Sequence, residues 1–256
     1  MKKLRVLIVL IVIFVIFTSI SFARPGGGGH GGGSSSSSGG HSSSRGHASS
    51  YNYNSKESSN PIENAILFIF MIIAMKSNSI ICCIKAVKKQ KQCKVALVDL
   101  SKYDQNWNLK KINKDIKKAF YIMSEAWTNM NQDIAIDYST EKLYINHKTQ
   151  LEWMKVKGER NVLKIPKLLS HRIIGIDNTN KENLGEIWVY IRGFMIDYIE
   201  VDGNITKGNR YIPTSYVEYW KFKNENGIWK LDEIRQRGNS KTLDEINIKI
   251  VKIYRH

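Results

Sequence analysis

The chain has 256 residues and a net charge of +16, from 39 lysines and arginines against 23 aspartates and glutamates. Lys85–Lys94 carries five lysines and no acid, whereas residues 95–256 are a mixed set of 27 basic and 21 acidic residues. A nucleic-acid-binding domain more often gathers basic residues, interleaved with aromatic ones, on its folded part. We therefore expect no nucleic-acid partner.

The N-terminal part combines a targeting segment with a linker. Residues 1–23 begin with basic residues, continue as a long apolar run and end in small residues, which predicts a signal peptide or a signal anchor. Residues 24–61 are rich in glycine and serine and cannot bury enough apolar surface to fold, so we expect a disordered linker. Its histidines, His30, His41 and His47, are isolated and predict no metal site.

A second apolar segment at residues 62–84 is long enough for a transmembrane helix, although Lys76 lies within it. A short interfacial or re-entrant helix is the alternative. A basic juxtamembrane segment at residues 85–103 follows, and basic residues also precede the first apolar run. Because cytoplasmic flanks of spans carry excess lysine and arginine, we expect a protein of the cell membrane whose C-terminal domain is cytoplasmic.

The composition becomes globular from residue 104, and we expect one domain over residues 104–256. Apolar residues recur every three or four positions between 107 and 130, which predicts an amphipathic helix, and a second helix is expected to end at Gly158. Segments rich in β-branched and aromatic residues predict four strands, at residues 168–177, 186–201, 216–223 and 228–235. Asn226-Gly227 predicts a hairpin turn between the last two strands.

Helices followed by four sequential strands predict an α+β fold, in which helices pack on one face of a curved four-stranded antiparallel sheet. Both alternating rows of residues 186–202 are mostly apolar, so we expect a concave, pocketed face on the other side of the sheet. Five aromatic residues are candidates for lining this pocket: Trp188, Tyr190, Phe194, Tyr198 and Trp220. Residues 243–256 fit either a final strand or a helix.

Lysines close to the membrane segments are candidates for contact with anionic lipid headgroups, where each contributes about 1 kcal/mol. Five belong to the juxtamembrane segment and three to the solvent side of the first predicted helix: Lys85, Lys88, Lys89, Lys91, Lys94, Lys110, Lys114 and Lys117.

Five segments occur in a characteristic order: DQNW at 104–107, AFYIMSEAW at 119–127, NVLKIPKL at 161–168, FMIDYIEVD at 194–202 and YVEYWKFKNENGIWKLDEIRQ at 216–236. This ordered set resembles the C-terminal domain of the Tim-forty-four family. Mitochondrial members are inner-membrane-associated subunits of the protein import motor, and bacteria carry membrane-anchored relatives. The resemblance implies a cone-like sheet with helices, similar to nuclear-transport-factor-two-like domains, and a non-enzymatic scaffold that contacts anionic lipid and protein partners.

We therefore expect a membrane-tethered scaffold or binding module at the inner face of the cytoplasmic membrane, in protein translocation or membrane-protein assembly. Its partners are an anionic lipid bilayer and an unidentified membrane or cytoplasmic protein. The chain lacks the long N-terminal region with which mitochondrial members engage their chaperone and channel, so the import-motor role is not carried over. A ribosome contact is an alternative, because a mitochondrial large-subunit ribosomal protein has a similar domain. If residues 62–84 do not span and the signal is cleaved, the domain is instead secreted.

Related cone-shaped folds also host isomerases and dehydratases, so a binder of a small apolar ligand, or an isomerase-like enzyme, is a further alternative. The acids and tyrosines that such an enzyme would use are Asp197, Glu218, Tyr190 and Tyr198, but no spacing requires it. His147 and His171 have no evident catalytic or metal-binding partner. The cysteines, Cys82, Cys83 and Cys93, lack metal-ligand spacing. We expect no catalytic residue, no cofactor and no metal.

Overall fold

The computed structural model describes residues 61–179, 185–236 and 240–250. The signal segment expected at residues 1–23 and the linker expected at 24–61 therefore lie, apart from residue 61, outside the described residues.

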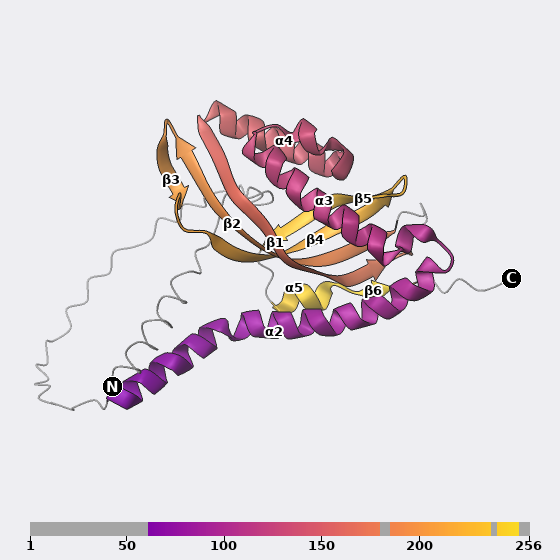
Figure 1. The fold of residues 1–256 in the computed structure, drawn as a ribbon, viewed down its shortest axis with the longest axis horizontal. Coiled ribbons are helices and arrows are strands. Elements are labelled where there is room, and N and C mark those ends of the chain that lie inside the picture. Colours follow the sequence, from indigo (N-terminus) through magenta and orange to yellow (C-terminus); the bar gives the residue numbers. More distant parts are fainter. Residues whose placement is uncertain (1–60, 180–184, 237–239, 251–256) are drawn as a thin grey trace, which may run out of the picture.

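Helices lie on both sides of a strongly curved sheet (Figure 1). The helices are α2 (Pro61–Ser101), α3 (Leu109–Thr128), α4 (Glu141–Val156) and α5 (Ser240–Glu245), with short 3₁₀ helices η1 (Gln105–Trp107) and η2 (Gln132–Tyr138). The strands are β1 (Glu159–Asp177), β2 (Glu186–Val201), β3 (Asn204–Gly208), β4 (Thr214–Glu225), β5 (Ile228–Gln236) and β6 (Ile248–Lys249).

The sheet has the strand order β5-β4-β2-β1-β6, and β3 pairs with β2 beside this path. All pairings are antiparallel except that of β6, which runs parallel to the last residues of β1. The α+β class is confirmed, and the four expected strands correspond to β1, β2, β4 and β5. The sheet is nevertheless larger than expected. An additional strand, β3, lies between the second and third expected strands, and β6 lies in the C-terminal segment 243–256, for which either a strand or a helix was expected.

Local signals in the sequence explain where the elements begin and end. Asn108 caps α3 by accepting from the backbone N–H groups of Lys110 and Lys111, and Thr140 caps α4 in the same way. Gly158 has a φ of +66°, a conformation that favours glycine and ends α4 as expected. Asn226 and Gly227 have φ values of +51° and +80°, which confirms the hairpin turn between β4 and β5.

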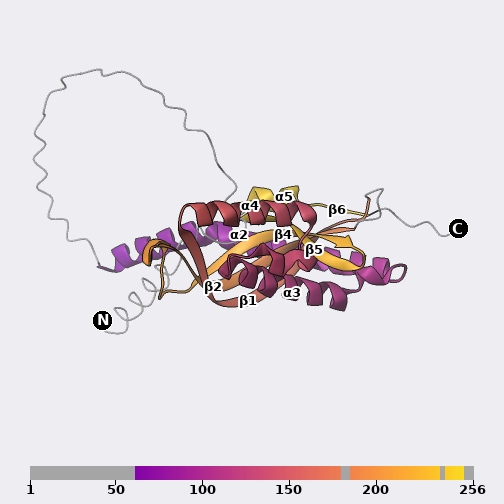
Figure 2. The ribbon, with the colours of Figure 1, turned by 90° about the horizontal axis from the view of Figure 1, so that it is seen from above.

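The concave face of the sheet is the face under α3 and α4, and the outer face is the face under α2 and α5 (Figures 1 and 2). Alternate residues of β2 separate the two, since Ile187, Val189 and Ile191 join the core with α3 and α4, whereas Tyr190 joins the core with α2. Large side chains of the concave core are fully buried: Phe120, Trp127, Phe222, Trp229, Ile112, Ile116 and Met123.

Helices cover both faces, so the expectation of helices on one face and a concave, pocketed face on the other is wrong. The reason is α2, which runs without a break to Ser101. Its Cys82 and Ala86 pack under the outer face, and its Cys93 and Leu97 join the concave core. The packed domain therefore begins upstream of residue 104, and the segment interpreted as juxtamembrane is part of it.

Among the helices of the described residues, none combines the length and the hydropathy that crossing a membrane would require.

Candidate functional site

The described part of α2 has two sides that differ in what they contact. On the inner side, Lys85 Nζ forms an ion pair with Asp244 Oδ2 at 2.7 Å, and Lys89 Nζ donates to the backbone carbonyl of Ile246. Burial is the main reason that the pKa of Lys89 is lowered from its usual value. These two lysines therefore attach α2 to the C-terminal segment and point toward the domain, not toward the exposed side of the helix.

The outer side of α2 is exposed and carries the other three lysines of this segment, Lys88, Lys91 and Lys94. Five aliphatic residues lie on the same side at helical spacing, with exposed fractions between 37% and 67%: Ile81, Ile84, Val87, Val95 and Val98. We call these eight residues the lysine-aliphatic face. Soluble surfaces seldom combine so many exposed aliphatic residues, and the mixture of aliphatic and cationic side chains suits the interface of an anionic bilayer.

The three lysine candidates of α3 lie apart from this face. Lys110, Lys114 and Lys117 are exposed on the solvent side of α3, which covers the concave face of the sheet, whereas α2 lies under the outer face. The sheet separates the two sets. The eight lysine candidates therefore do not form one surface.

The five aromatic pocket candidates are also divided between the two faces. Trp188, Tyr190, Phe194 and Tyr198 alternate along β2 toward the outer face, whereas Trp220 of β4 belongs to the concave core. Trp220 stacks on Phe120 of α3 with ring centroids 5.9 Å apart. The five candidates therefore do not share one face. A strand that is apolar on both sides gives no sign of which residues lie together.

Neighbouring side chains cover most of these aromatic rings. Tyr190 is buried beside Tyr219 under α2, and the guanidinium of Arg235 lies 4.4 Å from the ring centre of Trp188. Tyr198 is buried, with cations 5.7 Å from its ring centre on Lys164 and Arg210. These aromatic residues serve packing and cation–π contacts.

The acids considered for catalysis are buried on the concave face, where each accepts a hydrogen bond. Glu218 Oε2 accepts a hydrogen bond from Trp220 Nε1 at 2.8 Å, and Asp197 Oδ1 accepts one from Asn161 Nδ2 at 3.0 Å. Both contacts join residues of the sheet to one another. They hold side chains in place and do not by themselves indicate a catalytic pair.

The two histidines in the described part of the domain occupy different surroundings. His147 of α4 is buried edge-on against Trp127, and burial lowers its pKa to about 4. His171 of β1 is half-buried, with Nε2 3.0 Å from Asn113 Oδ1. Burial lowers the pKa of His171, and the charges of Lys117 and Arg172 lower it further. Within the described residues, no group of three or more histidine, cysteine or acidic side chains is arranged to hold a metal.

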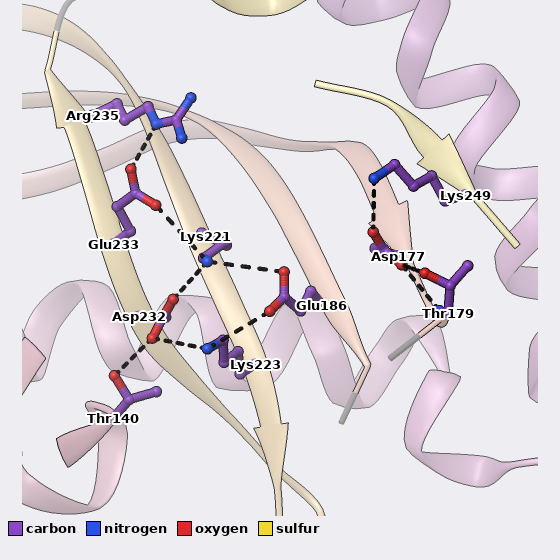
Figure 3. A network of polar contacts seen from close by, with 10 residues as sticks. All are labelled: Thr140, Asp177, Thr179, Glu186, Lys221, Lys223, Asp232, Glu233, Arg235 and Lys249. Carbon is purple, nitrogen blue, oxygen red and sulfur yellow. Dashed lines mark hydrogen bonds and ion pairs between the residues drawn. The ribbon is translucent and has the colours of Figure 1, made fainter. Parts of the chain in front are cut away.

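A network of charged side chains crosses β2, β4 and β5 (Figure 3). At its centre, the buried carboxylate of Asp232 lies 2.8 Å from Lys221 Nζ and 3.5 Å from Lys223 Nζ. Glu186 pairs with both lysines, at 3.9 and 3.7 Å. Asp232 also accepts a hydrogen bond from Thr140 at the start of α4. The ion pairs join β2, β4 and β5, and the hydrogen bond from Thr140 fastens the start of α4 to the edge of the sheet.

Sequence reasoning missed a cleft between α3 and β1. Its volume is about 440 Å³, and it is lined by Lys117, Tyr121, Leu168, Leu169, Ser170 and His171. The nearest signal in the sequence was Pro166, which disturbs a strand and lies at a neighbouring shift in the pairing of β1 with β2, between Lys164 and Lys167. Such a signal shows where a strand is irregular but does not show a cleft.

Comparison with known proteins gives little. No family model matches the chain, and no curated protein matches it. Among solved structures, the intermembrane space region of the chloroplast protein ARC6 is similar to this chain with a TM-score of 0.39 and 10% sequence identity, over 50% of this chain and 95% of that one. So low a score carries no argument about fold or function.

Proposed function

We propose that this protein is a non-enzymatic binding module that lies on an anionic membrane through the lysine-aliphatic face of α2. One observation carries the proposal: Lys88, Lys91 and Lys94 share an exposed helix side with five aliphatic residues, while the opposite side of the helix is packed on the domain. Each lysine near an anionic surface contributes about 1 kcal/mol, so three contribute about 3 kcal/mol at low salt. The aliphatic residues add the burial of apolar surface.

The same proposal places the domain at the inner face of the cell membrane, with the resemblance to the Tim-forty-four family and its cone-like domain as support. Basic residues flank both apolar segments of the chain, which favours a cytoplasmic position for the domain. A protein partner, and a role in translocation or membrane-protein assembly, follow from the resemblance alone. A cysteine introduced at the exposed Ser215 of β4 tests the position, since we expect no reaction with a membrane-impermeant thiol reagent in intact cells.

Lysine footprinting tests the contact with lipid. The full chain is reconstituted into nanodiscs of phosphatidylcholine alone or mixed with phosphatidylglycerol, and each is treated with an amine-acetylating reagent. We expect Lys88, Lys91 and Lys94 to react more slowly in the anionic discs than in the neutral ones, and the difference to shrink at high salt.

The control lies in the same molecule. Lys142, Lys155 and Lys157 are exposed on or just after α4, on the far side of the sheet from α2. They should react equally in both kinds of disc. Equal reactivity of the α2 lysines in both discs would remove the proposal.

A further inference from the structure

The cleft between α3 and β1 exists because β1 is irregular. In a regular strand, successive side chains point to opposite faces. The pairing with β2 shifts between Leu168 and Ser170, which leaves Leu169 as an extra residue. Such a bulge re-aims the side chains around it. As a result, four consecutive residues of β1 line one cleft: Leu168, Leu169, Ser170 and His171.

The polar end of the cleft is cationic. Lys117 of α3 lies on its wall, and Arg172 Nη1 donates to Ser170 Oγ at 3.4 Å from the neighbouring position of β1. Because Ser170 Oγ accepts from Arg172, its own proton remains available as a donor. The imidazole of His171 is held at the same end by Asn113. The ammonium group of Lys117 on α3 therefore lies at the same end of the cleft as the hydroxyl of Ser170 and the imidazole of His171 on β1.

The remaining wall is apolar. Tyr121 follows Lys117 by one turn of α3 and is 47% exposed, and Leu169 is 43% exposed. Leu168 connects this wall to the concave core. The volume of about 440 Å³ lies in the range of small-molecule sites. The cleft therefore offers a cationic end and an apolar end to a ligand of modest size.

We propose that this cleft binds a phosphate ester, with the phosphate at Lys117 and Ser170 and the apolar substituent against Leu168, Leu169 and Tyr121. Lysine serves as a point charge for phosphate, and the hydroxyl of Ser170 donates to its oxygens, whereas the imidazole N–H of His171 is taken by Asn113 Oδ1. The site is separate from the lysine-aliphatic face, so it does not depend on how α2 meets a membrane. The ester has two sources, a soluble metabolite or the headgroup of a phospholipid.

Equilibrium dialysis of the full chain in nonionic detergent tests the site, with hexyl phosphate, inorganic phosphate and hexanol as probes. We expect saturable binding of hexyl phosphate, and binding at least about tenfold weaker for each of the other probes, because each lacks one of the two contacts. Phosphatidic acid in the same detergent then separates the sources. Displacement of hexyl phosphate by it indicates a lipid headgroup, and absence of displacement indicates a soluble ester.

Two variants on adjacent residues provide the matched control. Lys117→Ala should weaken hexyl phosphate at least about tenfold, the loss of one charge-assisted contact. Lys118→Ala removes the same charge one residue further on, where Nζ points to Tyr138 Oη at 3.2 Å, and should leave binding unchanged. Leu169→Ala should weaken hexyl phosphate but not inorganic phosphate. Absence of saturable binding to the natural chain, or equal losses in the two lysine variants, would overturn the assignment.

Discussion

The concave and outer faces of the sheet hold their helices in different ways. On the concave face, α3 and α4 cover a continuous core in which Trp127 and Phe120 are fully buried. On the outer face, α2 rests on a smaller cluster that includes Cys82 and Ala86. Two lysine contacts to the C-terminal segment reinforce it. Apolar burial therefore holds α3 and α4. The start of the packed part of α2 rests on a small cluster with polar attachments, and only its later residues Cys93 and Leu97 reach the larger core.

This difference suggests that one face of the sheet supplies most of the stability of the domain and that α2 supplies its contacts with other molecules. On the concave face, α3 and α4 pack on the sheet with fully buried apolar side chains. The helix with the smaller core presents its exposed aliphatic residues and lysines outward. We infer that the domain is stabilised mainly from the concave side and makes its contacts from α2, and the predictions below test this division.

The largest effect is expected in the concave core. Trp127→Ala should destabilise the protein by about 3–5 kcal/mol, because it removes a fully buried indole and leaves a cavity. Trp153→Ala is the matched control, since Trp153 of α4 is 62% exposed and should change stability by less than about 1 kcal/mol. Urea unfolding of both variants measures the difference. Similar losses in the two would mean that the concave core is not the main source of stability.

The charge network should give the next largest effect. Asp232→Ala leaves Lys221 and Lys223 without their central partner and should cost about 3 kcal/mol. Glu225→Ala breaks the more exposed pair with Lys230, at 3.3 Å, and should cost less than about 1 kcal/mol. Equal costs would show that burial does not distinguish the two pairs.

The same network predicts a dependence on acid. Burial acts to raise the pKa of Asp232, but the hydrogen bond and charge of Lys221, with Lys223 and Thr140, lower it overall. Because the folded pKa lies below the unfolded value of about 4, the stabilisation is present at neutral pH and is lost as the pH falls below about 4. Unfolding of the Asp232→Ala variant should therefore depend less on pH in this range.

Burial of His147 predicts a second dependence of stability on pH, in a higher pH range than that of Asp232. Its pKa is lowered to about 4 by burial, whereas an unfolded histidine titrates near 6.5. Between these values the unfolded chain binds a proton that the folded chain does not. Stability should therefore fall as the pH is lowered through this window, by up to about 3 kcal/mol. His147→Phe, which keeps an aromatic ring beside Trp127, should flatten the fall, and an unchanged profile would contradict the assignment.

Much of the fold could be predicted from local pattern. The apolar spacing of α3 and the Asn226-Gly227 turn are strong signals because each is decided by neighbours in sequence. The packing of α2 had a weaker signal, since Cys82, Ala86, Cys93 and Leu97 recur at helical spacing among lysines. The lysines of this segment were interpreted as a membrane flank, although Lys85 and Lys89 form contacts within the domain.

The candidate sites were harder to predict because they depend on which strand face a residue occupies. In β2 both rows are apolar, so Trp188 and Trp220 could not be assigned to faces without the register of β4. The cleft depends on a bulge at Leu169, and Asp232 likewise occupies an extra position where β5 shifts against β4. Such shifts arise from tertiary packing, which a single sequence does not display.

The smallest expected effect compares two adjacent lysines on opposite sides of α2. Lys89→Met keeps an apolar stem but loses the bond to the carbonyl of Ile246, worth about 0.5–1.5 kcal/mol. Amide hydrogen exchange should therefore quicken about threefold to tenfold in residues 243–250, with no change in the footprint of Lys91 and Lys94.

Lys88→Met should do the reverse, because Lys88 is exposed on the lysine-aliphatic face. We expect exchange in residues 243–250 to stay as in the natural chain, and protection of Lys91 and Lys94 in anionic nanodiscs to weaken, since one of three attractive charges is gone. If both variants alter both measurements alike, α2 does not divide its two sides between the domain and the membrane. An opposite response of the two would show that one helix holds the fold with one side and the bilayer with the other.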